Sequence, residues 1–165
     1  MEFEGLEFTK LERKDVPVLT PIMKRAFDAD SKLFFQSPEG GPDGYDDGSF
    51  LIKWGIESGA HAFTIMKDGA AIGGIILFVS PDGKEGTLGC LFIDDMLEGK
   101  GFGSAAWRFA EKSFPDVEIW RTETPAVSYR NHCFYINKCG FSVTRVNGRR
   151  DDRFEAQFEL VKRMK

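Results

Sequence analysis

The sequence predicts a mixed α/β (α+β) fold, with a mostly antiparallel central sheet flanked by helices in the order β-α-α-β-β-β-α-β-α-β-β. Three apolar stretches between residues 61 and 93 are separated by the turn signals Asp68-Gly69 and Pro81-Asp82-Gly83, so they form antiparallel neighbours. Later strands alternate with helical segments, as in α/β folds. A chain of 165 residues is too short for two cores, so we expect a single domain over residues 1–165.

The N-terminal part predicts one strand and two helices. Residues 6–11 alternate as a strand does, and Asp15 followed by Pro17 is typical of a helix start. The first helix, expected to end near Phe27, has the apolar spacing of an amphipathic helix at Leu19, Ile22, Met23, Ala26 and Phe27. A shorter second helix is expected near residues 48–58.

The remaining elements follow from the same patterns. Strands are expected at residues 62–66, 71–79, 87–93, 117–122, 141–146 and 154–161, the last two joined by an Asn147-Gly148 turn. Helices are expected from about Gly101 to before Pro115, and from Ser128 to Cys139, where Gly140 ends the helix. Three successive hairpin strands exclude a purely parallel dinucleotide-binding fold.

Composition and charge exclude several classes of partner. The formal net charge is −4, which argues against nucleic acid. The longest apolar run, residues 70–79, is half the length that spans a bilayer, and the acidic N-terminus lacks the pattern of a signal peptide, so we expect no membrane. Three cysteines, an odd number, fit reduced thiols and a cytoplasmic location.

A glycine-rich loop lies between a predicted strand and a predicted helix. Residues 97–106 have the sequence LEGKGFGSAA. Glycines let a ligand approach backbone N–H groups, and a helix N-terminus favours anions, so phosphate is the expected guest. The alternative is a tight turn without a ligand. The dinucleotide pattern at Gly101-x-Gly103-x-x-Ala106 lacks the acidic residue expected about 20 positions later, because position 126 is Ala126.

The loop resembles the hallmark motif of the GNAT superfamily of N-acetyltransferases, Gln/Arg-x-x-Gly-x-Gly/Ala. The matching residues are Glu98-x-x-Gly101-x-Gly103, after the strand residues Leu91-Phe92-Ile93. A second match lies in residues 131–141, NHCFYINKCGF, which is similar to the family's helix that carries a Tyr and ends in Lys-x-Gly-Phe. The predicted order of elements is also that of the family, so the resemblance covers essentially the whole chain.

This resemblance implies an acetyl-coenzyme A-dependent enzyme that transfers the acetyl group directly to a primary amine, with no metal. The pantetheine would lie along Phe92, Ile93 and Asp94, where an N–H near Ile93 would stabilise charge on the thioester oxygen. Tyr135 would protonate the departing thiolate. The pyrophosphate would bind the backbone amides of Gly99, Lys100, Gly101, Phe102, Gly103 and Ser104, beside Glu98.

Three positions depart from the family pattern. Glu98 stands where the family has Gln or Arg, so its carboxylate must point away from the pyrophosphate or weaken its binding. Tyr135 lies five residues before Gly140, one more than the common spacing, and an interpretation as a core aromatic residue is the alternative. The family's Asn falls on Ser128, with Asn131 nearby, and either could approach the cofactor.

The expected binding site for the acceptor amine is inferred from the distribution of charge along the chain. Residues 28–47 hold six acids and one base, a formal charge of −5, in the loop between the first two helices. In the family this loop lines the acceptor site, so we expect Asp46 and Asp47 to attract a cationic amine. The alternative is that one of them caps the second helix.

The resulting function is N-acetylation of a small molecule or peptide. A non-catalytic acyl-coenzyme A-binding or sensor module is the alternative, and a nucleotide-dependent oxidoreductase is less favoured. His132, Cys133 and Cys139 lack the spacing of metal ligands. The residues do not identify a general base. Family members are often dimers, which leaves a homodimer open.

Overall fold

The computed structural model describes residues 1–148 and 154–165, whose strands form one sheet in the spatial order β1-β2-β3-β4-β5-β6-β8-β7. All neighbouring strands are antiparallel except β5 and β6, which are parallel. The strands are β1 (Glu2–Phe3), β2 (Leu6–Lys10), β3 (His61–Lys67), β4 (Ala70–Val79), β5 (Glu85–Ile93), β6 (Ile119–Pro125), β7 (Ser142–Asn147) and β8 (Gln157–Arg163). The predicted α/β class with a mostly antiparallel sheet is thereby confirmed.

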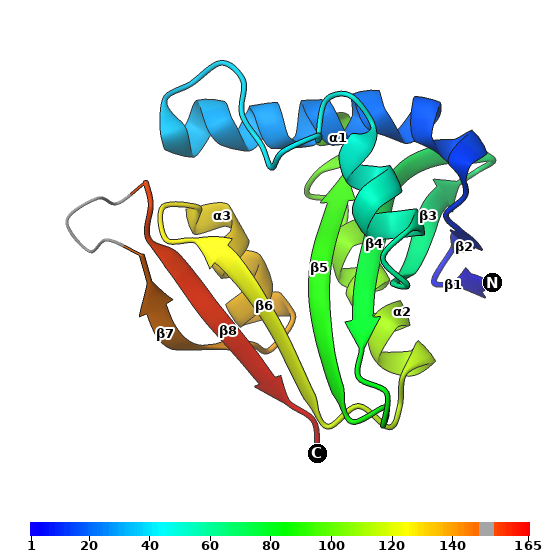
Figure 1. Cartoon of the computed structure of the whole chain (residues 1–165), viewed down its shortest axis with the longest axis vertical. Coiled ribbons are helices and arrows are strands. Elements are labelled where there is room, and N and C mark those ends of the chain that lie inside the picture. Colours follow the sequence, from blue (N-terminus) through cyan, green and yellow to red (C-terminus); the bar gives the residue numbers. More distant parts are fainter. Residues whose placement is uncertain (149–153) are drawn as a thin grey trace.

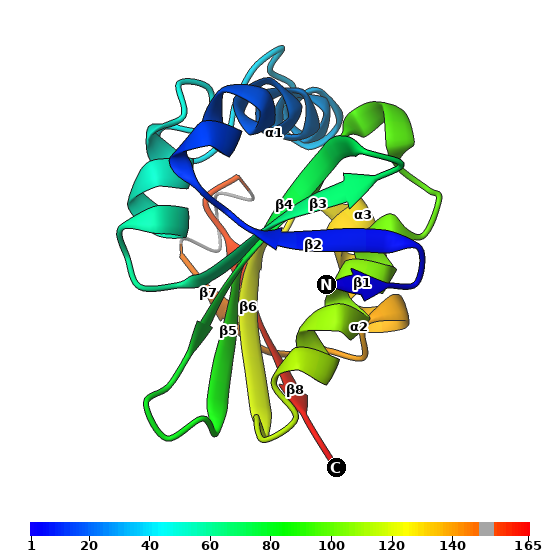
Figure 2. The ribbon, with the colours of Figure 1, turned by 90° about the vertical axis from the view of Figure 1, so that its right-hand side faces the viewer.

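Helices cover both faces of the sheet (Figures 1 and 2). Helix α1 (Val16–Asp30) and the π-helical segment Leu51–Ile56 pack on one face, and α2 (Phe102–Ser113) packs on the other. Helix α3 (Tyr129–His132) lies on the α2 side and continues directly as a π-helical segment, Cys133–Lys138. None of the helices in the described residues is both long and apolar enough to cross a membrane.

Each face has its own apolar core. On the α2 face, Trp107 and Trp120 meet edge to face with ring centroids 5.2 Å apart, and Phe8 stacks on Phe109 at 3.8 Å. On the α1 face, the predicted apolar residues Leu19, Ile22, Met23 and Ala26 are buried, and Phe27 is partly buried against them. The predicted spacing of α1 therefore identifies its buried side.

The structure differs from the predicted elements in several places, and β6 and β8 lie two to three residues later than the predicted strands 117–122 and 154–161. A short strand, β1, precedes the predicted first strand. Helix α1 does not end near Phe27 but runs to Asp30 and continues as a π-helical segment, Ser31–Phe35. The Asp28 carboxylate does not break the helix, because it accepts a hydrogen bond from Lys24 one turn earlier. The connection after Asn147 is longer than a two-residue turn, since β8 begins at Gln157, and residues 149–153 lie outside the described part.

The sheet forks between β5 and β6, and this fork positions the site. The two strands pair only over Glu85–Thr87 and Ile119–Arg121, and the hydroxyl of Thr122 then donates to the Leu88 carbonyl at 2.9 Å. A bulge at Gly89 shifts the register of β5 against β4. Beyond this point the edges of β5 and β6 separate, with α1 crossing above their ends (Figure 1).

Candidate active site

A large cavity of about 670 Å³ occupies the fork. Residues 89–93 of β5 and 122–125 of β6 form two walls, and the end of α1 forms a third. Gly40, Gly41 and Pro42 close it from the loop between the first two helices. The cavity is thus built from segments far apart in the chain.

A smaller cavity of about 260 Å³ lies beside the glycine loop. It is lined by Gly99, Gly101, Phe102, Gly103 and Ser104 and by the facing helix residues Arg130, Cys133, Phe134 and Lys138. The two cavities share the lining residues Leu91, Ile93, Glu98 and Asn131. They therefore meet at the end of β5.

The glycines of the loop meet different requirements. Gly99 and Gly101 have φ of +77° and +83°, a conformation that other residues adopt only with strain. Gly101 directly precedes α2, whose first turn is closed by the Ala105 N–H bonded to the Gly101 carbonyl. The N–H groups of residues 102–104 have no carbonyl partner within the helix, so they face outward at its N-terminus. A side chain at Gly103 would press on the ring of Phe134 at 3.3 Å.

The end of β5 presents a free backbone edge to the fork. The Asp94 N–H donates to the Ile72 carbonyl of β4 at 2.7 Å, so by strand alternation the N–H of Ile93 points away from β4. Ile93 lines both cavities, whereas Phe92 lines only the large one and is buried in the core on the α1 face. The Asp94 carboxylate lines neither cavity and instead pairs with Arg25 of α1 at 2.8 Å.

The negative charge of Glu98, beside the glycine loop, is compensated by a cation. Its carboxylate forms an ion pair with Arg130 of α3, whose guanidinium also lies 3.5 Å from Asp30. Sequence reasoning missed Arg130. The available signal was the carboxylate at position 98, which required a cation from elsewhere in the chain. Lys100, the nearest cation in sequence, is exposed and lines neither cavity.

Tyr135 lies in the wall of the large cavity, within the π-helical segment. The Cys139 N–H donates to the Phe134 carbonyl five residues earlier. A π-helical turn holds more residues than an α-helical turn, which accommodates the extra residue between Tyr135 and Gly140. Burial raises the pKa of the Tyr135 phenol most, and Cys90, Cys139 and Asp30 raise the pKa further, so the phenol stays protonated.

Ser128 and Asn131 occupy different places. The side chain of Asn131 donates to the Thr124 hydroxyl at 3.2 Å and lines both cavities. Ser128 is buried and lines only the large one. Asn131 is therefore the better placed of the two to contact a ligand that spans both cavities.

Asp46 and Asp47 are exposed, and neither lines the cavity. One Asp47 oxygen accepts hydrogen bonds from the Ser49 N–H at 2.9 Å and the Ser49 hydroxyl at 2.6 Å, just before the helical segment Leu51–Ile56. These bonds form a turn around Ser49, and no side-chain hydrogen bond caps the helical segment at Phe50, so the structure does not show the capping alternative either. The carboxylates that do line the cavity are Asp30, Glu98 and Glu123.

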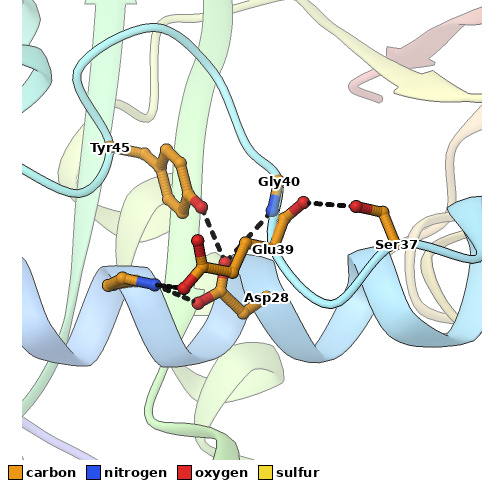
Figure 3. A network of polar contacts seen from close by, with 6 residues as sticks. Asp28, Ser37, Glu39, Gly40 and Tyr45 are labelled. Carbon is orange, nitrogen blue, oxygen red and sulfur yellow. Dashed lines mark hydrogen bonds and ion pairs between the residues drawn. The ribbon is translucent and has the colours of Figure 1, made fainter.

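The loop that closes the cavity is held by Asp28 (Figure 3). One Asp28 oxygen accepts from the Tyr45 hydroxyl at 2.7 Å and from the Gly40 N–H at 3.1 Å, and the other accepts from Lys24 at 2.6 Å. Lys24 also binds Glu39 at 3.0 Å. The acidic loop is therefore fixed to α1 in part by its own charges.

The Cys90 thiol lines the large cavity, where burial raises its pKa to about 12 and keeps the thiol protonated and weakly nucleophilic. Among residues 1–148 and 154–165, no three His, Cys, Asp or Glu side chains are grouped to hold a metal ion.

Comparisons with known proteins give the chain a family. The family model described as acetyltransferase (GNAT) family matches residues 24–141. The uncharacterized protein YrkN of Bacillus subtilis (strain 168) is 31% identical over 107 residues, and the match covers 58% of each chain. The aligned part thus spans little more than half of that relative.

Two solved structures share the fold. An acetyltransferase from Thermus thermophilus is 18% identical with a TM-score of 0.75, and the match covers 99% of this chain and 100% of that one. The PaiA N-acetyltransferase from Thermoplasma acidophilum, in complex with coenzyme A, is 17% identical with a TM-score of 0.78, covering 96% and 99%. Because the family model spans both the glycine loop and the helix that carries Tyr135, the chain belongs to the GNAT family of acetyltransferases.

Proposed function

We propose that the protein is an acetyl-coenzyme A-dependent N-acetyltransferase that transfers the acetyl group directly to a primary amine of a small molecule or peptide. The observation that carries this proposal is the meeting of two cavities at the end of β5, with Tyr135 in the wall of the larger one. One cavity suits a phosphate-bearing donor and the other suits an acceptor. Acyl transfer is the chemistry of the family to which the chain belongs.

The residues around the small cavity fit acetyl-coenzyme A. Outward N–H groups of the glycine loop and the first turn of α2 suit the pyrophosphate. Arg130 compensates the charge of Glu98, so that carboxylate does not rule out an anionic ligand. The cofactor-binding residues are Phe92, Ile93 and Asp94 through their backbone, residues 98–104, and Asn131. When bound, acetyl-coenzyme A supplies an acetyl group activated as a thioester.

The chain itself contributes positioning and two hydrogen-bond donors. The Ile93 N–H is aimed into the fork, where it can stabilise negative charge on an oxygen atom. The Tyr135 phenol holds a proton at neutral pH, which it can give to a departing thiolate. The ion pair between Arg25 and Asp94 ties α1 to the end of β5 and so fixes the distance between these donors and the acceptor wall.

On the acceptor side, we propose that Asp46 and Asp47 act on the acceptor through long-range electrostatic attraction. Their charges do not line the cavity but lie in the loop that closes it, where they can attract a cation before it binds. The same proposal includes a homodimer, and it gives the acceptor as a class, a primary amine of a small molecule or peptide.

Two measurements test this function. Acetyl-coenzyme A should raise the melting temperature and NAD should not, because only a ligand of the native state stabilises it. Release of free coenzyme A thiol in the presence of a panel of primary amines then separates an enzyme from a binding or sensor module. Stabilisation by NAD alone would favour the oxidoreductase, and stabilisation by acetyl-coenzyme A without thiol release would favour the sensor.

A further inference from the structure

Asp30, the last residue of α1, places a carboxylate in the wall of the large cavity. Its side chain is 25% exposed, so it is mostly withdrawn from solvent yet open to the cavity. Tyr135 lies in the same cavity, close enough for the charge of Asp30 to raise the pKa of the phenol. A carboxylate and a proton-donating phenol therefore share one chamber.

Asp30 is only partly compensated by the residues around it. Among the described residues, its charged and titratable neighbours are Arg130 of α3, Asp95 after β5, and Tyr135. Arg130 bridges two carboxylates: its Nη2 lies 3.5 Å from Asp30, and its Nη1 makes a closer ion pair with Glu98. Within the described part of the chain, no group donates a hydrogen bond to the Asp30 side chain. Its oxygens can therefore accept hydrogen bonds from a bound cation.

The other carboxylates of the cavity are less suited to this task. Glu98 is committed to Arg130, and Glu123 is exposed to solvent. Of the described residues that line the cavity, none is a Lys, Arg or His. A cationic amine that enters it thus meets anionic and apolar groups, while Arg130, which pairs with Asp30 and Glu98, lines only the small cavity.

We propose that Asp30 binds the ammonium group of the acceptor and removes a proton from it, and that the acceptor is a primary amine carried on an apolar body. The apolar body is inferred from Phe27, Phe35 and Phe50, which line the same cavity. In this step an N–H bond of the ammonium breaks and an O–H bond forms on Asp30, which leaves a neutral amine with a free electron pair. The proton later passes to solvent. This inference rests on the proposed function.

The electrostatics of the site agree with this role. Burial raises the pKa of Asp30 above its ordinary value, Arg130 lowers it and Asp95 raises it again. A carboxylate with a raised pKa is a stronger base than a free one. The free carboxylate is required, so activity should rise as pH increases through this pKa.

The test compares an amine with its neutral analogue. Calorimetry in saturating coenzyme A, which carries no acetyl group, measures binding of phenethylamine and 2-phenylethanol. We expect the wild type to prefer the amine at least about tenfold, and Asp30→Asn to lose roughly 10- to 100-fold in amine affinity with the alcohol unchanged. Asp30→Glu, which keeps the charge, should retain the preference. Asp116→Asn, the same change in an exposed carboxylate before β6, should match the wild type.

Melting temperature and coenzyme A affinity, measured on each variant, show that the fold and the small cavity are intact. If Asp30→Asn does not fold, Asp30→Ser is the substitute. A wild type without amine preference, or an Asp30→Asn variant that keeps it, would overturn the inference. If thiol release with amines persists at the wild-type rate in Asp30→Asn, the inference fails while the proposed function stands; if the wild type releases no thiol with any amine, the proposed function fails.

Discussion

The two sides of the fork are built in different ways. The donor side is largely local: strand β5, the glycine loop and the start of α2 lie between residues 85 and 113. The acceptor side combines α1, the loop after it, β6 and the helix that carries Tyr135. A short motif can specify the first but not the second, because the second depends on side-chain contacts between distant segments. Substitutions on each side of the fork test this division.

Tyr135, in the wall of the large cavity, is proposed to act on the departing thiolate itself, so its loss should have the largest effect. Tyr135→Phe removes only the hydroxyl and leaves the ring packed against Phe141 at 5.9 Å. If the phenol donates a proton to the departing thiolate, turnover should fall roughly 10²- to 10⁴-fold. Acetyl-coenzyme A affinity should not change, since the donor contacts remain. Steady-state kinetics and calorimetry measure the two quantities.

Tyr129→Phe is a matched control, because Tyr129 is on the same helix but exposed and outside both cavities. It should retain wild-type turnover. Equal turnover in Tyr135→Phe and Tyr129→Phe would reject a catalytic role for Tyr135 and return it to the core aromatic interpretation.

On the donor side, the most direct test is to break the ion pair between Arg130 and Glu98. Arg130→Gln leaves the Glu98 carboxylate without its partner beside the proposed pyrophosphate site. We expect acetyl-coenzyme A affinity to fall about 10- to 100-fold, the range for loss of a charged hydrogen-bonding partner. Glu98→Gln combined with Arg130→Gln should recover part of the loss, because no unpaired charge remains at position 98. Calorimetric titration of these two variants and of Glu98→Gln alone measures the coupling, and strictly additive effects would argue against it.

The donor side also shows what the sequence can and cannot predict. The glycine loop is identified from residues 98–103 alone, because Gly99 and Gly101 answer a local need of the backbone, although Gly103 is required by its contact with Phe134. The same motif showed that Glu98 places a carboxylate beside the expected pyrophosphate site, but it did not show which residue compensates that charge. Arg130 lies 32 positions later, and only the packing of α3 beside the loop brings the two together.

On the acceptor side, the acidic stretch predicted from charge composition borders the large cavity, but charge composition did not predict which residues line it. The acidic stretch 28–47 does border the cavity, yet its loop contributes Gly40, Gly41 and Pro42 there, while Asp47 binds Ser49. Asp30 and Asp28 belong to the same charge window, but helix α1 was expected to end before them. The longer helix turns Asp30 toward the fork and Asp28 toward the loop, which charge counting cannot distinguish.

Substitution of Asp28 should selectively weaken the tertiary contacts that hold the acceptor side together. Asp28→Asn replaces an acceptor of three hydrogen bonds (Figure 3) and should cost about 2 kcal/mol in free energy of unfolding. The KM for the acceptor should rise several-fold while acetyl-coenzyme A affinity is kept, because the loop closes only the large cavity. Glu39→Gln, which removes the exposed second partner of Lys24, should cost less than about 0.5 kcal/mol. Denaturant titrations give both values.

This stabilisation should depend on pH in a definite direction. Burial works to raise the pKa of Asp28, but hydrogen bonds from Lys24, Tyr45 and Gly40 outweigh it, so the pKa lies below its ordinary value. The contribution is therefore present above the unfolded-state pKa of about 3.9 and lost as pH falls through the lower folded-state pKa. The difference in stability between wild type and Asp28→Asn should shrink below about pH 4. A difference that grew in acid would contradict this assignment.

The smallest effect is expected from Asp46 and Asp47, which carry charge near the cavity without lining it. In Asp46→Asn/Asp47→Asn the acceptor KM should rise by less than about threefold, and the rise should vanish in about 1 M salt, because exposed charges act only through a screened field. Asp30→Asn should raise the KM far more and keep most of its effect in salt, since Asp30 is largely buried. Kinetics at two ionic strengths separate the two cases. A large, salt-resistant effect of the double variant would mean that these carboxylates contact the amine, and the acceptor wall would then include the tip of the loop rather than the end of α1.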